Sequence, residues 1–215
     1  MKKKTVALLL ALTLVLGVAA GGTIAWLTDK TDTVTNTFAP TGINIKLEEY
    51  LNPDGSKSED PLRSWEAPLV PGATYSKDPV VSVSSDSEDC YLFVKVTNGA
   101  DGLLDFKSGL TADKGWTAGT KTDTDEGNGV PVGVWYRIVK KGSTPNTWNL
   151  IDEDKVTVSE DVTKSNMPTG KVTLTYTAYA CQYYKDNTPN VGSTDNVDAN
   201  GHYFTAAEAW AKIGD

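Results

Sequence analysis

The sequence predicts an all-β protein, a jelly-roll-like β-sandwich with a short C-terminal helix and long polar loops, over residues 42–215. Two observations lead to this fold class. Apolar and polar residues alternate in several short runs, which is the pattern of half-buried strands. Polar, turn-rich stretches separate these runs, as they do in sandwiches and barrels rather than in alternating β and α units.

The expected strands follow one another along most of this region. In the first, Ile43, Ile45 and Leu47 alternate with polar residues. The run 148–151 is expected to be the hairpin partner of 132–140, because the turn chemistry of 141–146 lies between them. The expected strands are 43–48, 80–83, 91–96, 132–140, 148–151 and 171–184.

The run 171–184 has the clearest alternation, so its two faces can be assigned. One face is expected to carry Val172, Leu174, Tyr176, Ala178 and Ala180, and the other Thr173, Thr175, Thr177, Tyr179 and Cys181.

Loops and one helix complete the expected fold. The polar stretches expected to form loops are 52–60, 84–89, 117–129 and 185–201. At the C-terminus, Thr205 can cap a helix, and Glu208 three residues later completes a capping box. The alanine-rich run that follows favours a short helix.

Residues 1–25 have the three parts of a secretory signal peptide. A cationic start is followed by the uncharged apolar run Thr5–Ala20, and small residues then lead to an expected cut between Ala25 and Trp26. The alternative is a retained membrane anchor over Thr5–Thr28, whose last third is rich in Gly and Thr and suits a membrane poorly. The protein is therefore expected to be secreted or at the cell surface, and to touch a membrane only through an uncleaved signal.

Net charge and length limit the functions and the number of domains expected for the rest of the chain. The formal net charge is −8, and removal of the three lysines Lys2, Lys3 and Lys4 with the signal would make it more negative. An acidic protein of this kind is not expected to bind nucleic acid. The remaining length suits one domain, 42–215, preceded by an N-terminal segment, 26–41.

Three stretches of sequence carry a family resemblance. The first is Gly21-Gly22-Thr23-Ile24-Ala25-Trp26-Leu27-Thr28-Asp29-Lys30, followed by Asn36-Thr37-Phe38 and the strand after Gly42. The second is Leu69–Pro79, a Pro-Gly turn and a Lys-Asp pair before a strand, and the third is Tyr91–Val96. Together they resemble the TasA and camelysin (CalY) family of exported proteins.

The resemblance implies a jelly-roll-like domain that assembles into extracellular fibres of a biofilm matrix in Gram-positive bacteria. It also implies two kinds of partner: the SipW-type signal peptidase during export, and other copies of the same chain in a homopolymer.

The segment Trp26–Phe38 has features that suit such assembly. It is rich in Thr and includes Val34, contains no proline or glycine and ends in an aromatic residue, so it suits an added edge strand. A strand donated to a neighbour's open sheet edge would bury Phe38, and Val34 and Trp26 are further candidates for burial. Two alternatives stay open: the segment pairs with its own domain, or it is disordered.

No catalytic residues are expected. Metallopeptidase activity is attributed to camelysins, but the only histidine is His202, so the usual zinc ligand set and a His-Glu-x-x-His motif are lacking. A Gly-x-Ser-x-Gly motif is also lacking.

The two cysteines, Cys90 and Cys181, both lie in expected strands. The simplest expectation is a disulfide between neighbouring strands. Two buried free thiols are the second interpretation, and a nucleophile paired with His202 is the third.

Two further patterns have weak functional interpretations. The run Asp123–Gly129 partly resembles a calcium loop, with Asp123 and Asp125 as candidate ligands, but it lacks the later acidic positions, and solvated turn residues are the alternative. Trp65, Trp116 and Trp148 lie near loops and are candidates for an exposed carbohydrate platform. No other cofactor is expected.

The sequence thus favours a structural protein, a secreted subunit that polymerises by strand donation. The alternative is a monomeric, adhesin-like binding module that presents its loops to a glycan or protein. A camelysin-type metallopeptidase ranks last.

Overall fold

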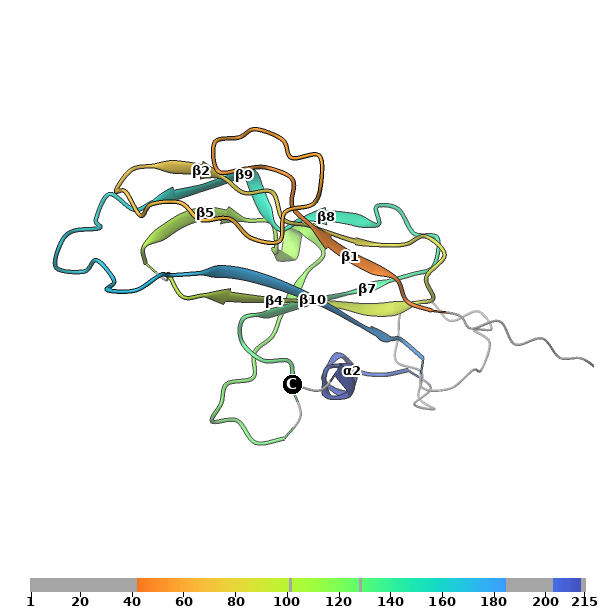
Figure 1. Ribbon diagram of the computed structural model, residues 1–215. Coiled ribbons are helices and arrows are strands. Elements are labelled where there is room, and N and C mark those ends of the chain that lie inside the picture. Colours follow the sequence, from red (N-terminus) through yellow and green to blue (C-terminus); the bar gives the residue numbers. More distant parts are fainter. Residues whose placement is uncertain (1–41, 101, 128, 185–202, 214–215) are drawn as a thin grey trace, which may run out of the picture. The chain divides into compact units, whose positions relative to one another are not determined.

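The computed structural model describes residues 42–100, 102–127, 129–184 and 203–213 (Figure 1). The chain divides into two units, Met1–Pro40 and Thr41–Asp215, and every described residue belongs to the second. In this unit, strands from distant parts of the sequence form two β-layers, and a short helix lies on the outer side of one layer (Figure 1).

The first layer is a four-stranded antiparallel sheet with the strand order β10-β4-β7-β6. Its strands are β4 (Cys90–Asn98), β6 (Thr117–Ala118), β7 (Val134–Val139) and β10 (Leu174–Gln182). β10 pairs with β4 along its whole length, from Leu174↔Asn98 to Gln182↔Cys90. Because β10 is the last strand in this order, its second edge has no strand partner among the described residues.

The second layer consists of two three-stranded sheets, β1-β3-β8 and β2-β9-β5. Its strands are β1 (Ile45–Glu48), β2 (Thr74–Ser76), β3 (Val80–Val83), β5 (Leu104–Ser108), β8 (Thr147–Asn149) and β9 (Ile151–Val158). β2 and β3 follow each other closely in the chain, and so do β8 and β9, so the two sheets are halves of one layer (Figure 1). The left-handed residues Glu153 and Asp154 (φ 65° and 51°) lie within β9, where its register with β5 shifts between Asp105 and Lys107.

The main core lies between the layers. Along β4, Cys90, Leu92 and Val94 point into it and are fully buried, in the alternation expected of a strand that is covered on both faces. Val81 and Val83 of β3 meet them from the other layer. This interior apolar contact is what holds the two layers together.

A second, aromatic cluster covers the outer face of the first layer. The intervening residues of β4, Tyr91 and Phe93, point outward and pack against the helix α2 (Ala206–Ile213). The Phe93 and Trp210 ring centroids are 5.3 Å apart. At the helix start, Glu208 N–H donates to Thr205 Oγ1 (3.2 Å) and Thr205 N–H donates to Glu208 Oε2 (2.8 Å), which is the predicted capping box.

The all-β sandwich with a short C-terminal helix is confirmed, and so is the division of faces on β10. Tyr176 and Ala178 pack against the main core, whereas Tyr179 and Cys181 pack against the outer cluster. The jelly-roll connectivity stays a prediction.

The predicted hairpin between 132–140 and 148–151 is wrong. β7 pairs with β4 and β6, and after it the chain crosses to the other layer, where β8 pairs with β3. The predicted turn is present, with Ser143 N–H donating to the Lys140 carbonyl (3.0 Å), but turn chemistry alone cannot distinguish a hairpin from a crossing between layers. β9 was missed beyond Ile151, because the charged run Asp152–Lys155 hides its strand pattern.

Candidate functional site

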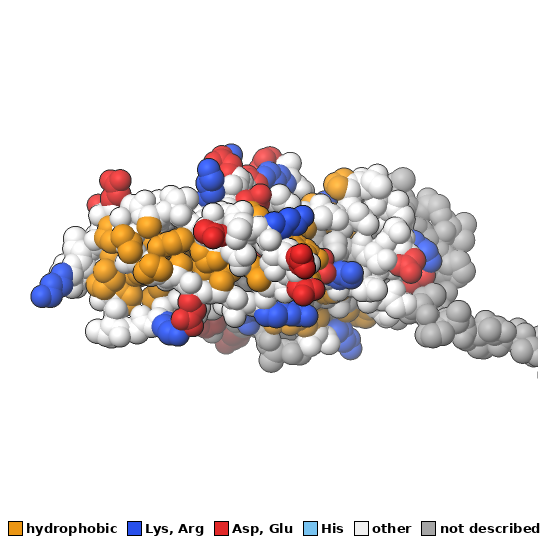
Figure 2. All heavy atoms as spheres, turned by 45° about the horizontal axis from the view of Figure 1, so that its top comes forward, with side chains coloured by type: hydrophobic (Ala, Val, Ile, Leu, Met, Phe, Trp, Pro, Cys, Tyr) orange, Lys and Arg blue, Asp and Glu red, His pale blue; other side chains and the backbone are white. Residues whose placement is uncertain are grey.

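An elongated groove of about 950 Å³ opens between the two layers at the edge formed by β10. One wall is the stretch 167–176, which leads into β10, and the opposite wall is the irregular segment 62–69. The floor is the inner surface of the second layer, with Leu47, Tyr75, Leu104, Val156 and Val158. Hydrophobic side chains gather on this side of the molecule between scattered charged ones (Figure 2).

The groove exists because the strands of the second layer do not cover the whole width of the sandwich. β1 pairs with β3 and also lies beside β10, so it closes the sandwich at that end. β1 ends at Glu48, and no described strand continues it alongside β2. The interior surface of β2 and β9 is therefore open at the edge, where one more strand would cover it.

Both walls present main-chain groups that have no described partner. β10 bonds only to β4 within its sheet, which leaves its outer edge open. In the opposite wall, the amide groups of 63–67 and of Leu69 donate to no other described residue. Open edges of this kind accept an extended peptide by main-chain hydrogen bonding.

The two ends of the groove differ in polarity, and we call them the polar end and the apolar end. At the polar end, Lys77 Nζ lies 2.9 Å from Glu49 Oε2, and both side chains are only 13% exposed. Trp65 Nε1–H donates to Glu49 Oε1 (3.0 Å), and the Lys77 ammonium lies 5.2 Å from the centroid of the Trp65 ring. Each charge of this largely buried ion pair is compensated by its partner, as burial of a charge requires.

Tyr176 of β10 also belongs to the polar end. Its hydroxyl is buried and has no hydrogen-bond partner among the described residues. Burial raises the pKa of this hydroxyl, and the nearby Glu49 carboxylate raises it further. A hydroxyl in this position can form a hydrogen bond with a polar group that enters the groove.

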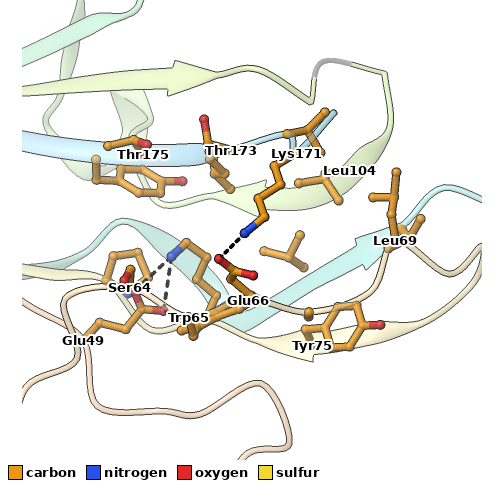
Figure 3. A pocket seen from close by; sticks show the side chains of 18 of the residues that line it. Glu49, Ser64, Trp65, Glu66, Leu69, Tyr75, Leu104, Lys171, Thr173 and Thr175 are labelled. Atoms are coloured by element: carbon orange, nitrogen blue, oxygen red, sulfur yellow. Dashed lines mark hydrogen bonds and ion pairs between the residues drawn. The ribbon is translucent and has the colours of Figure 1, made fainter. Parts of the chain in front are cut away.

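The apolar end is formed by Leu69, Tyr75 and Leu104, which gather at the opposite side of the close view (Figure 3). The Tyr75 hydroxyl donates to the Pro68 carbonyl (2.6 Å) and fixes the irregular wall to β2. Between the two ends, Lys171 and Glu66 reach toward each other across the groove (Figure 3), with 2.6 Å between Nζ and Oε1. Both side chains are largely exposed, so this contact is a weak bridge over the opening.

This arrangement suits the binding of an extended, partly apolar peptide. Within the described ranges, no three His, Cys, Asp or Glu side chains are grouped to hold a metal ion. None of the described helices is long and apolar enough to cross a membrane.

Several predicted site residues lie outside the described residues: Ala25, Trp26, Val34, Phe38 and His202. The groove itself was not predicted. Its sequence signal is the spacing of Leu62, Trp65, Ala67 and Leu69 in a stretch bounded by prolines, which reads as a loop when it is taken alone.

The predicted disulfide is wrong, although the neighbouring strands are confirmed. Cys181 is opposite Tyr91 and Cys90 is opposite Gln182, so the two thiols are one residue out of step and lie on opposite faces of the sheet. Both cysteines are free. Burial raises the pKa of the Cys90 thiol to about 12, which makes it a poor nucleophile.

The candidate calcium ligands have a local structural role. The Asp125 carboxylate accepts hydrogen bonds from Thr122 N–H (2.7 Å) and Thr122 Oγ1 (2.9 Å), and these bonds lower its pKa. This contact closes a turn in the loop. Asp123 lies in the same exposed stretch, and the described residues gather no further ligand around it.

The predicted tryptophan platform is wrong for Trp116 and Trp148. Trp116 is only 2% exposed, and its ring centroid lies 6.1 Å from that of Trp148. The Arg137 guanidinium lies 4.3 Å from the Trp148 ring centroid and fills the space where a ligand would stack. Trp65 lines the groove instead.

No family model, curated protein or solved structure matches this chain.

Proposed function

We propose that the protein is a secreted structural subunit that assembles into extracellular fibres of a biofilm matrix. In this proposal, a SipW-type signal peptidase cuts between Ala25 and Trp26. The freed segment Trp26–Phe38, which we call the donor segment, then adds to the groove of a neighbouring copy. The observation that carries the proposal is the groove, an apolar interior surface with open main-chain edges on both sides.

The place where the chain enters the domain supports joining between copies. Ser84 N–H donates to the Asn44 carbonyl (2.8 Å), and Asn44 N–H donates to Ser87 Oγ (2.9 Å). These bonds hold the start of β1 at the end of β3 that lies away from the groove, since the groove begins where β1 ends. Because the donor segment leaves the domain at one end and the groove lies toward the other, we expect copies to add head to tail.

Chain length argues against filling of the groove by the same copy. Tyr75 lies nine residues before Ser84 along β2 and β3, which places the apolar end about 25–30 Å from Asn44. Phe38 lies six residues before Asn44, and that length of chain spans at most about 21 Å. The alternative in which the segment pairs with its own domain therefore cannot bring Phe38 to the apolar end.

The test compares the chain starting at Trp26 with a chain starting at Gly42, by sedimentation and electron microscopy over a range of concentrations. We expect polymers from the first chain only. The matched control is the longer chain with Phe38→Asp, which keeps the length but adds a charge. If both lengths stay monomeric, the proposal is wrong. The adhesin-like module would then be favoured, with the groove available to a peptide from another protein.

A further inference from the structure

We infer that the donor segment runs antiparallel to β10 in the groove, with Phe38 at the apolar end. This inference rests on the proposed function and goes beyond it, because strand donation alone fixes neither the edge nor the direction. It follows from two gradients of polarity, one in the groove and one in the donor segment.

The groove gradient runs along β10. Lys171, at the start of the β10 wall, lies beside Leu104 of the apolar end, whereas Thr175 lies toward Ser64 and Glu49 of the polar end (Figure 3). Tyr176 follows at the polar end, close enough to Glu49 for the carboxylate to affect its hydroxyl. The chain of β10 therefore runs from the apolar end to the polar end.

The donor gradient runs the opposite way. After the first two residues, Trp26 and Leu27, the stretch Thr28–Thr33 has the sequence Thr-Asp-Lys-Thr-Asp-Thr and no apolar residue, so the gradient extends over residues 28–38. Its last part, Val34–Phe38, places Val34, Asn36 and Phe38 on one face of an extended strand. Only this face can enter an apolar groove, since the other carries threonines alone.

Asn36 decides the direction. It lies between two apolar residues on the inward face, so burial requires a hydrogen-bond partner for it. With Phe38 at the apolar end, Asn36 lies about 7 Å nearer to the polar end. There the groove presents the Glu49 carboxylate, the Lys77 ammonium and the Tyr176 hydroxyl. The reverse direction places Asn36 among Leu69 and Leu104, and Phe38 at the ion pair.

Matching the polar part of the donor with the polar end makes the donor antiparallel to β10. Antiparallel pairing also gives the better ladder geometry for an edge strand. Thr173, an exposed residue of the β10 wall, then lies close to Thr37 of the neighbour and far from its Thr33.

Disulfide trapping in assembled protein tests the direction. The chain starting at Trp26 carries Thr37→Cys together with Thr173→Cys, and its matched control carries Thr33→Cys together with Thr173→Cys. Cys181→Ser is present in both, and Cys90 is left in place because it is fully buried. After mild oxidation of the polymers, covalent ladders are measured on non-reducing gels.

Paired residues in an antiparallel ladder have Cα atoms about 5 Å apart, whereas a shift of four residues adds about 13 Å, beyond the reach of a disulfide. We therefore expect ladders from the Thr37→Cys chain at least about tenfold above the control. Ladders mainly from the Thr33→Cys chain would show another direction or register, and polymers without either ladder would place the donor away from this part of β10; each result overturns the inference. If no polymers form even from the parent chain, strand donation itself is wrong, and the inference fails with it.

Discussion

Replacement of Tyr176 by phenylalanine is expected to stabilise the protein. The hydroxyl is buried and has no hydrogen-bond partner in the described part of the chain, while the ring packs against the main core. A buried hydroxyl that lacks a hydrogen bond costs about 1–3 kcal/mol. Tyr176→Phe removes this cost, but it also leaves a small void, which is itself destabilising. We therefore expect Tyr176→Phe to raise the free energy of unfolding by about 1 kcal/mol. For a domain of this size, that corresponds to a rise in Tm of about 2–4 °C.

Tyr75→Phe is the matched control, with the opposite expected sign. It also removes one hydroxyl from a tyrosine that lines the groove, but this hydroxyl donates to the Pro68 carbonyl at 2.6 Å. Losing that bond should lower the free energy of unfolding by about 0.5–1 kcal/mol. Both variants are measured in the chain starting at Trp26, by urea denaturation at a concentration where the parent is monomeric. A loss of about 1 kcal/mol or more in Tyr176→Phe would mean that the hydroxyl has a partner, and would refute the reasoning about the polar end.

Three further predictions concern the cysteines, alkaline pH and the donor segment. Thiol alkylation followed by mass spectrometry should find both Cys90 and Cys181 reduced, with Cys181 modified first in the native protein because Cys90 is fully buried; a disulfide-linked peptide pair would contradict the register. The pKa values of Cys90 and Tyr91 are each raised to about 12, mainly by burial, and that of Tyr176 is also raised. The folded state therefore holds these protons after the unfolded state has lost them, and the free energy of unfolding should fall as pH rises from about 9 to 12, which denaturant titrations can follow. Phe38→Asp should leave the monomer as stable as the parent and abolish polymers, since burial of an unpaired charge in the groove is strongly unfavourable; polymers seen by electron microscopy at the parental concentration would exclude Phe38 as the anchor.

Local patterns were enough to predict the fold class and the faces of β10, because both depend on alternation within one strand. The same alternation failed for β9, where the charged run Asp152–Lys155 includes two residues in the left-handed conformation. The burial of Trp116 beside the Arg137 guanidinium could not be predicted either, because the two residues are far apart in the sequence. Whether such a side chain is buried depends on contacts between distant parts of the chain, and the spacing of residues in the sequence does not reveal these contacts.

The prediction for the two cysteines failed by a single residue of register. Their strands are neighbours as predicted, but the pairing of Cys181 with Tyr91 rather than with Cys90 sends the thiols to opposite faces. One residue of register decides this, and register depends on the whole sheet. The groove could not be predicted for the same reason. It depends on β1 pairing with β3 and ending there, so that no described strand lies along the free edge of β2.

The start of β1, at the end of the sandwich away from the groove, has a mechanical consequence. A pull applied at Gly42 acts along the direction of β1, so it loads the β1–β3 ladder lengthwise. Bonds perpendicular to the strands then share the load and must break together, instead of opening one after another as in a zipper. A strand lying along β10 would be loaded in the same lengthwise way. In the proposed polymer, tension passed between copies would therefore meet its greatest resistance along the axis on which these two ladders lie.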